Sequence, residues 1–290
     1  PGQTMTYAAV RRTPVPGTRV AKMDAGTAKG MPGVLQILNM GDFIAVVGDS
    51  YWQAQQALNA ITAEYTSSES KIRTSADQFA SFAAALDEAG ETGGKELVGR
   101  GDAKGAMAGA AKRISAEYQA PYLAHAPMEP MNATVWVRDG KCDIWTGTQV
   151  PLFARSAAAK ALGLAADDVT LHHPILGGGF GRRLETDYVI MAARIGQATG
   201  YPVKMIWPRE EDTQKGLFRC ADMSRFAGGL DAQGRLVAYS NVFTQRHDPA
   251  DACDCAFYDI PNKSIRHAEA DLHLPCAAFR SVDHSQQAFF

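Results

Sequence analysis

Leu176-Gly177-Gly178-Gly179-Phe180-Gly181-Arg182-Arg183 contains four glycines in five consecutive positions. Glycine loses more backbone entropy on folding than any other residue, so such a cluster indicates a place where bare backbone is required. Residues 169–173 before it predict a strand, and residues 184–198 after it predict a helix. A loop in that position directs backbone N–H groups and a helix dipole toward an anion such as phosphate. Arg182 and Arg183 add formal positive charge there, and a tight turn without a ligand is the alternative.

The spacing of these glycines differs from that of two common nucleotide-binding loops. A Rossmann loop has the pattern Gly-x-Gly-x-x-Gly, with an acidic residue about twenty positions later at the end of the next strand. Here the next predicted strand is followed by Trp207-Pro208-Arg209. A Walker loop requires Gly-Lys-Ser or Gly-Lys-Thr, which does not follow these glycines. A dinucleotide-dependent oxidoreductase is therefore the weaker interpretation.

The composition is that of an ordinary globular protein. The 290 residues suffice for two domains or one large one, and 46% of them are hydrophobic and 21% charged. A net charge of −2 gives no indication of a nucleic-acid or membrane surface. No apolar run approaches the ~20 residues that a membrane helix needs. Because the sequence starts at Pro1 and stops in an apolar run, we expect a fragment, whose lack of a signal peptide says nothing about localisation.

The cysteines and histidines do not form a recognisable metal site. The five cysteines include one close pair, Cys253 and Cys255, but its spacing is shorter than in zinc sites and no second pair follows. His172 and His173 are neighbours at the end of a predicted strand, where successive side chains point to opposite faces. We therefore expect all four residues to be structural.

The first seventy residues predict a small α+β domain. Three short apolar runs predict strands, at residues 5–10, 34–38 and 43–47. Apolar residues at helical spacing predict a helix over residues 51–65, with Asp49-Ser50 as its N-cap. Residues 66–70 are polar and interrupt this pattern. We therefore place a domain boundary there and assign residues 1–70 to the first domain.

Residues 71–290 predict a longer domain that mixes helices and strands. Apolar spacing predicts helices at residues 75–89, 106–114, 153–162 and 184–198. Two hairpins are predicted, one turning at Asp139-Gly140 and one across residues 231–234. Strands are also predicted at residues 169–173 and 202–206. The order of these elements indicates an α+β fold without regular βαβ alternation.

Four segments of this chain resemble motifs of one family. Gly177-Gly178-Gly179-Phe180-Gly181 resembles the loop that approaches molybdenum in the xanthine dehydrogenase and aldehyde oxidase family. The other three segments follow the family's order along the chain: His125-Ala126-Pro127-Met128-Glu129-Pro130, Trp145-Thr146-Gly147-Thr148-Gln149-Val150-Pro151 and Ala278-Phe279-Arg280. Residues 128–134 and Gly181-Arg182-Arg183 are similar to one branch, the large (beta) subunit of isoquinoline 1-oxidoreductase-type enzymes.

The resemblance implies both a fold and an activity. Residues 1–70 would be an a/b hammerhead domain, since Tyr51-Trp52 resembles the end of that domain, and residues 71–290 a C-terminally truncated first molybdenum-cofactor-binding domain. The implied whole protein is a molybdenum hydroxylase that oxidises N-heterocycles or aldehydes with water as the oxygen source. The implied cofactor is a molybdenum-pterin cytosine dinucleotide, and the implied partner is a small subunit that carries [2Fe-2S] clusters. Members of the branch are often periplasmic or inner-membrane-associated, and a cytoplasmic location stays open.

The resemblance also implies seven cofactor-binding residues: Gln149, Gly178, Gly179, Phe180, Gly181, Arg182 and Arg280. The backbone of Phe180 and Gly181 would lie beside the molybdenum ligands, and the Gln149 amide would donate to an oxygen ligand. Arg280 would lie near the pterin or the substrate. A polar strand end for Gln149 and a surface salt bridge for Arg280 are the alternatives. Glu129 is interpreted as a carboxylate that fixes a turn.

Two parts of the implied enzyme are expected beyond residue 290. The family's catalytic base is a glutamate in a Gly-Glu segment that has no counterpart here, and the second cofactor-binding domain is also missing. Because the pterin is held between two domains, we expect this chain alone to bind no molybdenum and to be inactive. A non-catalytic binding module that reuses the same scaffold is a further alternative.

Overall fold

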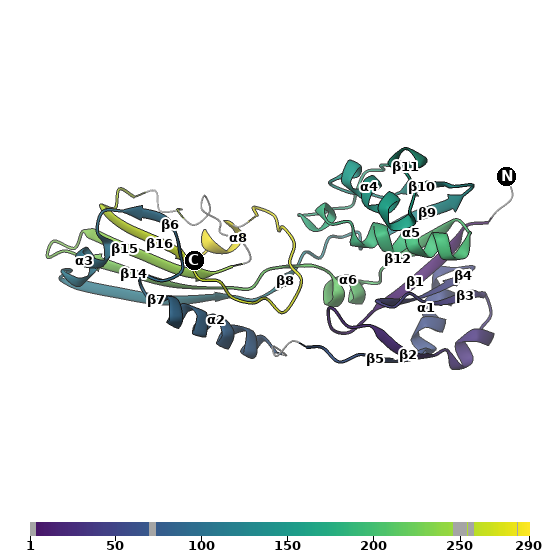
Figure 1. The fold of residues 1–290 in the computed structure, drawn as a ribbon, viewed down its shortest axis with the longest axis horizontal. Coiled ribbons are helices and arrows are strands. Elements are labelled where there is room, and N and C mark those ends of the chain that lie inside the picture. The colour runs from purple at the N-terminus through teal and green to yellow at the C-terminus, as the bar shows by residue number, and fades with distance from the viewer. Residues whose placement is uncertain (1–3, 70–73, 246–253, 255–257, 283) are drawn as a thin grey trace. The chain divides into compact units, whose positions relative to one another are not determined.

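The chain forms two units, each made of two separate stretches of sequence (Figure 1). The computed structural model describes residues 4–69, 74–245, 254, 258–282 and 284–290. Unit 1 comprises residues 1–69 and 124–217, and unit 2 comprises residues 70–123 and 218–290. The first change of unit, between residues 69 and 70, lies in the polar segment 66–70, and residues 71–290 contribute to both compact units.

Unit 1 is built on a mixed seven-stranded sheet of order β11-β10-β9-β12-β1-β4-β3. Its strands are β1 (Thr6–Arg12), β3 (Val34–Asn39), β4 (Phe43–Gly48), β9 (Asn132–Arg138), β10 (Lys141–Trp145), β11 (Val169–His172) and β12 (Val203–Ile206). β1 pairs in parallel with β12, where Thr6 lies opposite Val203, and antiparallel with β4. One sheet therefore joins residues 1–69 to residues 124–217, and the first stretch is not a unit by itself.

Helices cover both faces of this sheet, because alternate strand residues point in opposite directions. Phe43, Ala45 and Val47 of β4 belong to the core cluster that includes α4 (Pro151–Leu162) and α5 (Asp187–Thr199). Ile44 and Val46 belong to the cluster that includes α1 (Tyr51–Ala60) on the other face. The remaining elements of unit 1 are β2 (Val20–Asp24), β5 (Thr62–Tyr65), α6 (Arg209–Lys215) and the 3₁₀ turns η1 (Gly26–Gly30), η2 (Ala166–Asp168) and η3 (Arg182–Leu184).

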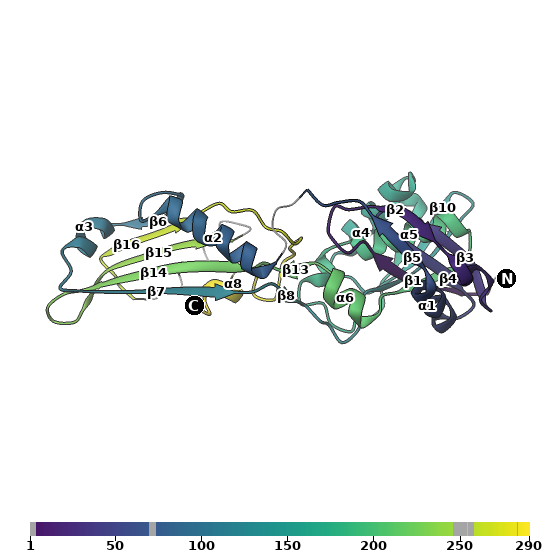
Figure 2. The same ribbon diagram turned by 90° about the horizontal axis from the view of Figure 1, so that it is seen from below.

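Unit 2 is a five-stranded sheet of order β6-β16-β15-β14-β7 (Figure 2). Its elements are α2 (Ser75–Ala89), β6 (Lys95–Arg100), α3 (Ala103–Ala108), β7 (Lys112–Ala120), β13 (Phe218–Arg219), β14 (Asp222–Leu230), β15 (Leu236–Thr244), β16 (Asn262–His267) and α8 (His284–Gln287). Met223 and Val242 pack in one cluster with Phe82 of α2. The next side chain on β14, Ser224, hydrogen-bonds to Gln287 of α8. α2 and α8 therefore lie on opposite faces of the sheet. The short strand β8 (Leu123–Ala124) lies where the chain passes from unit 2 to unit 1.

Both units mix helices and strands, as the sequence predicted, and several elements are confirmed in detail. α2 spans the predicted residues, and Gly90 follows it as the C-cap. Ser50 caps α1 by accepting a hydrogen bond of 3.3 Å from the Gln53 N–H. The two predicted hairpins are β9–β10 and β14–β15. None of the helices formed by the described residues is long and apolar enough to cross a membrane.

Three predicted helices have the wrong bounds. The helix predicted over residues 51–65 ends at Ala60, because residues 62–65 form β5 and pair with β2. The helix predicted over residues 106–114 is instead α3, which ends before Gly109, and residues 112–120 form β7 along β14. The helix predicted from residue 184 begins only at Asp187, because residues 182–184 form a 3₁₀ turn.

Candidate functional site

The glycine loop, residues 177–181, has a backbone that few other residues would adopt. φ is +97° at Gly178, +55° at Phe180 and +99° at Gly181. The two glycines take these values without strain, whereas a positive φ is uncommon for a bulky residue such as Phe180. The loop follows β11 and continues into η3. This conformation confirms that bare backbone is required here.

Neighbouring side chains of the same chain explain two of the glycines. A Cβ at Gly177 would come within 2.5 Å of the Glu129 Cβ, and a Cβ at Gly179 within 2.4 Å of Gln149 Oε1. Contacts this short do not occur between real side chains, so larger residues would displace Glu129 or Gln149. The loop is therefore tightly packed against the two segments that contain those residues.

Three consecutive N–H groups in the loop have no acceptor among the residues that the structure describes. The Gly177 N–H donates to Glu129 Oε2 at 2.6 Å, and the Gly181 N–H donates to Gln149 Oε1 at 3.1 Å. The N–H groups of Gly178, Gly179 and Phe180 make no hydrogen bond to any residue that the structure describes. Backbone donors are normally satisfied, so three adjacent free ones are suited to an external acceptor.

The side chain of Gln149 lies against this loop from the start of α4. Because its Oε1 accepts from Gly181, its Nε2 is the free end, and it makes no hydrogen bond to the described residues. The side chain is exposed, so Nε2 is an available donor beside the loop. The structure thus brings Gln149 together with Gly178, Gly179, Phe180 and Gly181. The Gly181 N–H donates to Gln149, whereas the backbone of Gly181 was expected beside the molybdenum ligands.

The expected positive charge of Arg182 is turned into the protein. Its side chain is buried, with an exposed fraction of 2%, and two of its nitrogens lie 2.8 Å from the two oxygens of Asp187. Burial alone would raise the pKa of Asp187, but the guanidinium beside it lowers that pKa. The Arg182 guanidinium also lies 5.6 Å from the Trp207 ring centroid. Its charge is therefore compensated inside unit 1 by Asp187.

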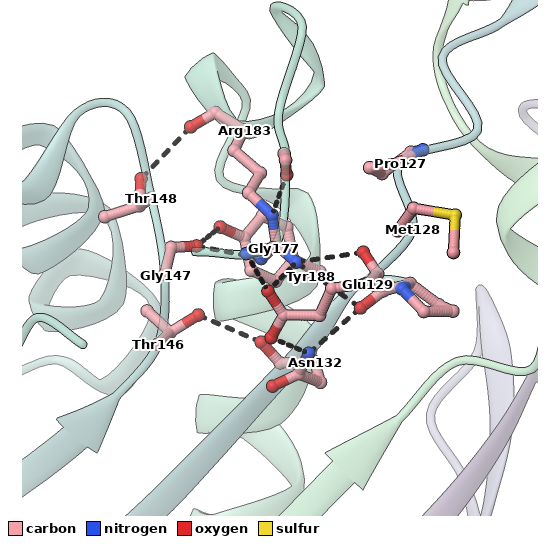
Figure 3. A network of polar contacts seen from close by, with 12 residues as sticks. Pro127, Met128, Glu129, Asn132, Thr146, Gly147, Thr148, Gly177, Arg183 and Tyr188 are labelled. Atoms are coloured by element: carbon pink, nitrogen blue, oxygen red, sulfur yellow. Dashed lines mark hydrogen bonds and ion pairs between the residues drawn. The ribbon is translucent and has the colours of Figure 1, made fainter. Parts of the chain in front are cut away.

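Arg183 is also buried and connects three segments of the site (Figure 3). Its guanidinium donates to the carbonyl oxygens of Gly178 at 3.0 Å, Gly147 at 2.9 Å and Glu129 at 3.1 Å. The Nη2 atom of Arg183, which donates to the Glu129 carbonyl oxygen, also lies 3.1 Å from the Glu129 carboxylate. These contacts join residues 125–130, residues 145–151 and the glycine loop. The sequence did not predict this role for Arg183, since burial cannot be read from the motif.

The predicted helix dipole does not act directly on the glycine loop. α5 starts at Asp187, after η3 and Thr186, and its first turn carries the Asp187 carboxylate. That carboxylate already provides a negative charge at the helix N-terminus. The donors that this loop offers are therefore its free backbone N–H groups and the Gln149 amide.

Arg280 lies in unit 2, apart from the other six predicted residues, which all lie in unit 1. Its side chain is exposed and makes no hydrogen bond or ion pair with the described residues, so the surface salt bridge weighed as its alternative is not formed among them. Ser281 and Val282, which follow it, have φ values of +70° and +50°. Positive φ at two successive non-glycine residues is a strained conformation of the kind found at functional loops.

The histidines and cysteines form no metal site among the described residues. His172 Nε2 lies 3.0 Å from Asp143 Oδ1, whereas His173 Nε2 lies 2.6 Å from the Thr148 carbonyl oxygen. The two rings therefore have different partners, as their positions on a strand predicted. Cys253 and Cys255 lie outside the residues that the structure describes.

Comparison with known proteins identifies the family. The family model of the molybdopterin cofactor-binding domain matches residues 90–290. The chain is 34% identical over 241 residues to the isoquinoline 1-oxidoreductase subunit beta of Brevundimonas diminuta, covering 81% of this chain and 31% of that protein. It is 28% identical over 284 residues to the aldehyde oxidoreductase molybdenum-binding subunit of Escherichia coli O157:H7, covering 88% of this chain and 37% of that protein.

The fold is also that of solved molybdenum enzymes. The aldehyde oxidoreductase of Desulfovibrio gigas superposes with a TM-score of 0.75 at 19% identity, covering 100% of this chain and 38% of that one. This chain thus spans about a third of the length of its curated relatives, 31% and 37% in the two cases above. The family model covers most of the sequence and includes the glycine loop, so the chain belongs to the molybdopterin cofactor-binding domain family.

Proposed function

We propose that this chain is part of the large subunit of a molybdenum hydroxylase that oxidises N-heterocycles or aldehydes with water as the oxygen source. Both classes of substrate occur in the names of its relatives, an isoquinoline oxidoreductase and an aldehyde oxidoreductase. The observation that carries the proposal is the set of free donors at the glycine loop: three consecutive backbone N–H groups beside the Gln149 amide. Oxygen and sulfur ligands of a bound cofactor are acceptors for such donors.

The residues of the loop fit a molybdenum-pterin group. Gly178 and Gly179 carry no side chain that would stand between their N–H groups and a ligand, although Gly179 is buried beside Gln149, and the free end of the Gln149 amide provides a donor next to them. When bound, the group supplies the two-electron oxidation of the substrate. The chain's own residues hold and orient it: the N–H groups of Gly178, Gly179 and Phe180 bind acceptor atoms, and Gln149 Nε2 binds a further one. Arg182 and Arg183 stabilise the loop from inside the protein, because their guanidiniums are buried.

The proposal includes parts that lie outside this chain. The cofactor is proposed to be the cytosine dinucleotide form, and a small [2Fe-2S] subunit is proposed to accept the electrons. A second cofactor-binding domain and a glutamate base are proposed to complete the site, and Arg280 is proposed to contact the pterin or the substrate. We also propose that residues 1–70 correspond to a hammerhead domain, although their strands complete the sheet of unit 1. A periplasmic or inner-membrane-associated location is also proposed, by resemblance to this branch of the family, with a cytoplasmic location as the alternative.

The test is made on the full-length large subunit purified with its small subunit. Molybdenum is measured by mass spectrometry, cytidine monophosphate is measured after acid hydrolysis, and dye-linked oxidation is followed with quinoline-type heterocycles and aldehydes. We expect about one molybdenum per protein and turnover of one of the two substrate classes. A protein without molybdenum, although produced with a competent cofactor supply, would show that the loop is scaffold and favour a binding module.

A matched pair of glycine variants tests the site itself. Gly179→Ala places a methyl group 2.4 Å from Gln149 Oε1, whereas Gly30→Ala places one in open space without a positive φ. The exposed Gln149 side chain must move to make room, so its amide is displaced from the loop; loss of one such hydrogen bond costs about 1 kcal/mol, and we expect molybdenum content to fall roughly five- to tenfold in Gly179→Ala. Gly30→Ala should retain the wild-type content. Equal molybdenum in both variants would exclude the glycine loop as the cofactor contact.

A further inference from the structure

The Glu129 carboxylate binds the start of the glycine loop at several points (Figure 3). Its Oε2 accepts a hydrogen bond of 2.6 Å from the Gly177 N–H and lies 3.1 Å from Arg183 Nη2. Its Oε1 accepts a hydrogen bond of 2.8 Å from the side-chain amide of Asn132. Both carboxylate oxygens are therefore engaged, and one of them holds loop backbone directly.

The backbone of Glu129 completes a two-way connection to Gly177. The Glu129 N–H donates to the Gly177 carbonyl oxygen at 3.1 Å, so both polar groups of Gly177 bind the same residue. The Glu129 Cβ occupies the space where a Gly177 side chain would lie. Two segments separated by 48 positions are thus fixed in one register at the first residue of the loop.

Glu129 stays ionised in this environment. Burial alone would raise its pKa, but the Asn132 amide, the Gly177 N–H and the Arg183 guanidinium together lower it. The side chain keeps an exposed fraction of 35%, whereas that of Arg183 is 0%. Because the Arg183 guanidinium is fully buried, the Glu129 carboxylate stabilises unit 1 as its ion-pair partner and also fixes the local geometry of the loop.

We propose that Glu129 is a positioning residue for cofactor binding, an inference that rests on the proposed function. Its carboxylate holds Gly177 and Arg183 so that the loop leaves the N–H groups of Gly178, Gly179 and Phe180 free for the ligand. Arg183 donates to the carbonyl of Gly178, which fixes the next peptide unit in the same way. Glu129 itself does not contact the ligand; it acts through the loop backbone.

The experiment compares Glu129→Ala and Glu129→Gln with Glu185→Gln in the full-length large subunit with its small subunit. The Ala variant removes all side-chain contacts, and the Gln variant keeps one acceptor oxygen for the Gly177 N–H. Glu185 follows η3, and its carboxylate makes no hydrogen bond or ion pair with the described residues, so it is the matched control. Three readouts are taken: molybdenum content, thermal midpoint, and hydrogen exchange of a peptide spanning residues 174–183 before cofactor loading.

A positioning role predicts a specific pattern across these readouts. Loss of a hydrogen bond to a charged group changes an equilibrium by about tenfold or more, so Glu129→Ala should hold at most roughly a tenth of the wild-type molybdenum. Exchange of the Gly177 amide, which donates to Glu129, should speed up about tenfold in that variant, with no change outside unit 1. Glu129→Gln should recover molybdenum to within about threefold of wild type, and Glu185→Gln should match wild type.

Each failure has a distinct signature. Wild-type molybdenum content and unchanged loop exchange in Glu129→Ala would overturn the positioning role and leave the proposed function standing. A wild-type protein without molybdenum, combined with faster loop exchange in Glu129→Ala, would overturn the proposed function while the loop-holding role stands. A drop of the thermal midpoint that is equal in Glu129→Ala and Glu129→Gln, with equal molybdenum loss, would show a general structural role and overturn the proposal.

Discussion

Arg183 Nη1 donates a hydrogen bond of 2.9 Å to the carbonyl oxygen of Gly147, 36 residues earlier in the chain. In the opposite direction, the Gln149 N–H and the Thr148 hydroxyl donate to the carbonyl oxygen of Arg183 at 2.9 and 3.1 Å. The glycine loop and the segment of Gln149 are therefore joined by one residue through both its side chain and its backbone. Because Gln149 also accepts from Gly181, displacing Arg183 would change the position of the free Gln149 amide.

Arg183→Lys tests how much this buried guanidinium stabilises unit 1. A lysine keeps the charge but cannot reproduce the planar set of donors, so the carbonyls of Gly147 and Gly178 would lose partners. We expect the free energy of unfolding to fall by about 3 kcal/mol. All four tryptophans lie in unit 1, so urea denaturation of the 290-residue chain followed by tryptophan fluorescence reports on that unit.

The control for this prediction is Arg235→Lys. The Arg235 side chain has an exposed fraction of 76% and pairs only locally with Asp231. The change should cost less than about 0.5 kcal/mol. A cost for Arg183→Lys that is no larger than this would show that the arginine does not connect the three segments.

Tyr188→Phe removes the second donor to the carbonyl oxygen of Gly147, which Arg183 also binds. The Tyr188 hydroxyl is fully buried and donates to the Gly147 oxygen at 2.8 Å. Since Arg183 still satisfies that oxygen, we expect a loss of only about 1 kcal/mol, measured by the same denaturation. Tyr201→Phe is the control, because Tyr201 is exposed, and it should leave stability unchanged. A loss above about 3 kcal/mol would mean that the oxygen depends on the tyrosine rather than on Arg183.

The backbone of the site could be predicted from the sequence, but the direction of its charges could not. Gly178 and Gly181 have positive φ, and clustered glycine is a direct signal of such a backbone. Arg182 and Arg183 were expected to face a ligand, whereas both are buried against partners. One partner, Asp187, is five residues from Arg182, but Gly147 is 36 residues from Arg183. Such distant pairings depend on the tertiary fold, which local motifs do not encode.

The elements that were wrong have different causes. Residues 112–120, which form β7, do alternate polar and apolar side chains, with Ile114, Ala116 and Tyr118 on one face, but the preceding helix was extended over the start of this pattern to residue 114. Strand β7 lies at an edge of the sheet in unit 2, where pairing with β14 holds it. The division into units was hidden, because β1 and β12 pair although 196 residues separate Thr6 from Pro202, the residue before β12. The hairpins β9–β10 and β14–β15 were predicted because their turns are local.

Asp187→Asn tests how much the Asp187 carboxylate stabilises the buried charge of Arg182. The effect of this substitution on the free energy of unfolding should depend on pH. The pKa of Asp187 is lowered in the folded chain, so the stabilisation by its charge is present above its ordinary pKa and is lost as the pH falls through the lowered value. At pH 7 we expect Asp187→Asn to reduce the free energy of unfolding by about 3 kcal/mol. The difference from wild type should shrink as the pH is lowered below about 4.

Asp42→Asn is the control for that pair. Asp42 also accepts from an arginine through both oxygens, at 2.8 and 3.0 Å, but its side chain has an exposed fraction of 53%. Exposed pairs of this kind contribute about 1 kcal/mol or less. Equal effects of the two substitutions at pH 7 would show that burial of Arg182 adds nothing to the energy of its ion pair.

Glu211→Gln should make unit 1 less sensitive to pH in the neutral range. Burial raises the pKa of Glu211 to about 7, even though the Arg12 N–H donates to its Oε1 at 2.7 Å and Arg12, Lys215 and Arg11 lie nearby. A carboxyl group with a raised pKa stabilises the folded state fully below its ordinary pKa and loses that contribution as the pH rises through about 7. For a shift of this size the loss is on the order of 3 kcal/mol.

Glutamine keeps an acceptor for the Arg12 N–H but cannot ionise. The free energy of unfolding of the variant should therefore increase relative to that of wild type as the pH rises from about 5 to about 8. The measurement is the difference in unfolding free energy between the two proteins at each pH, which cancels the titration of groups they share. Glu210→Gln removes a carboxylate at the exposed neighbouring position and is the control for the substitution itself. A flat difference for Glu211→Gln would mean that Glu211 is already ionised below pH 5, and that the arginines around it outweigh its burial.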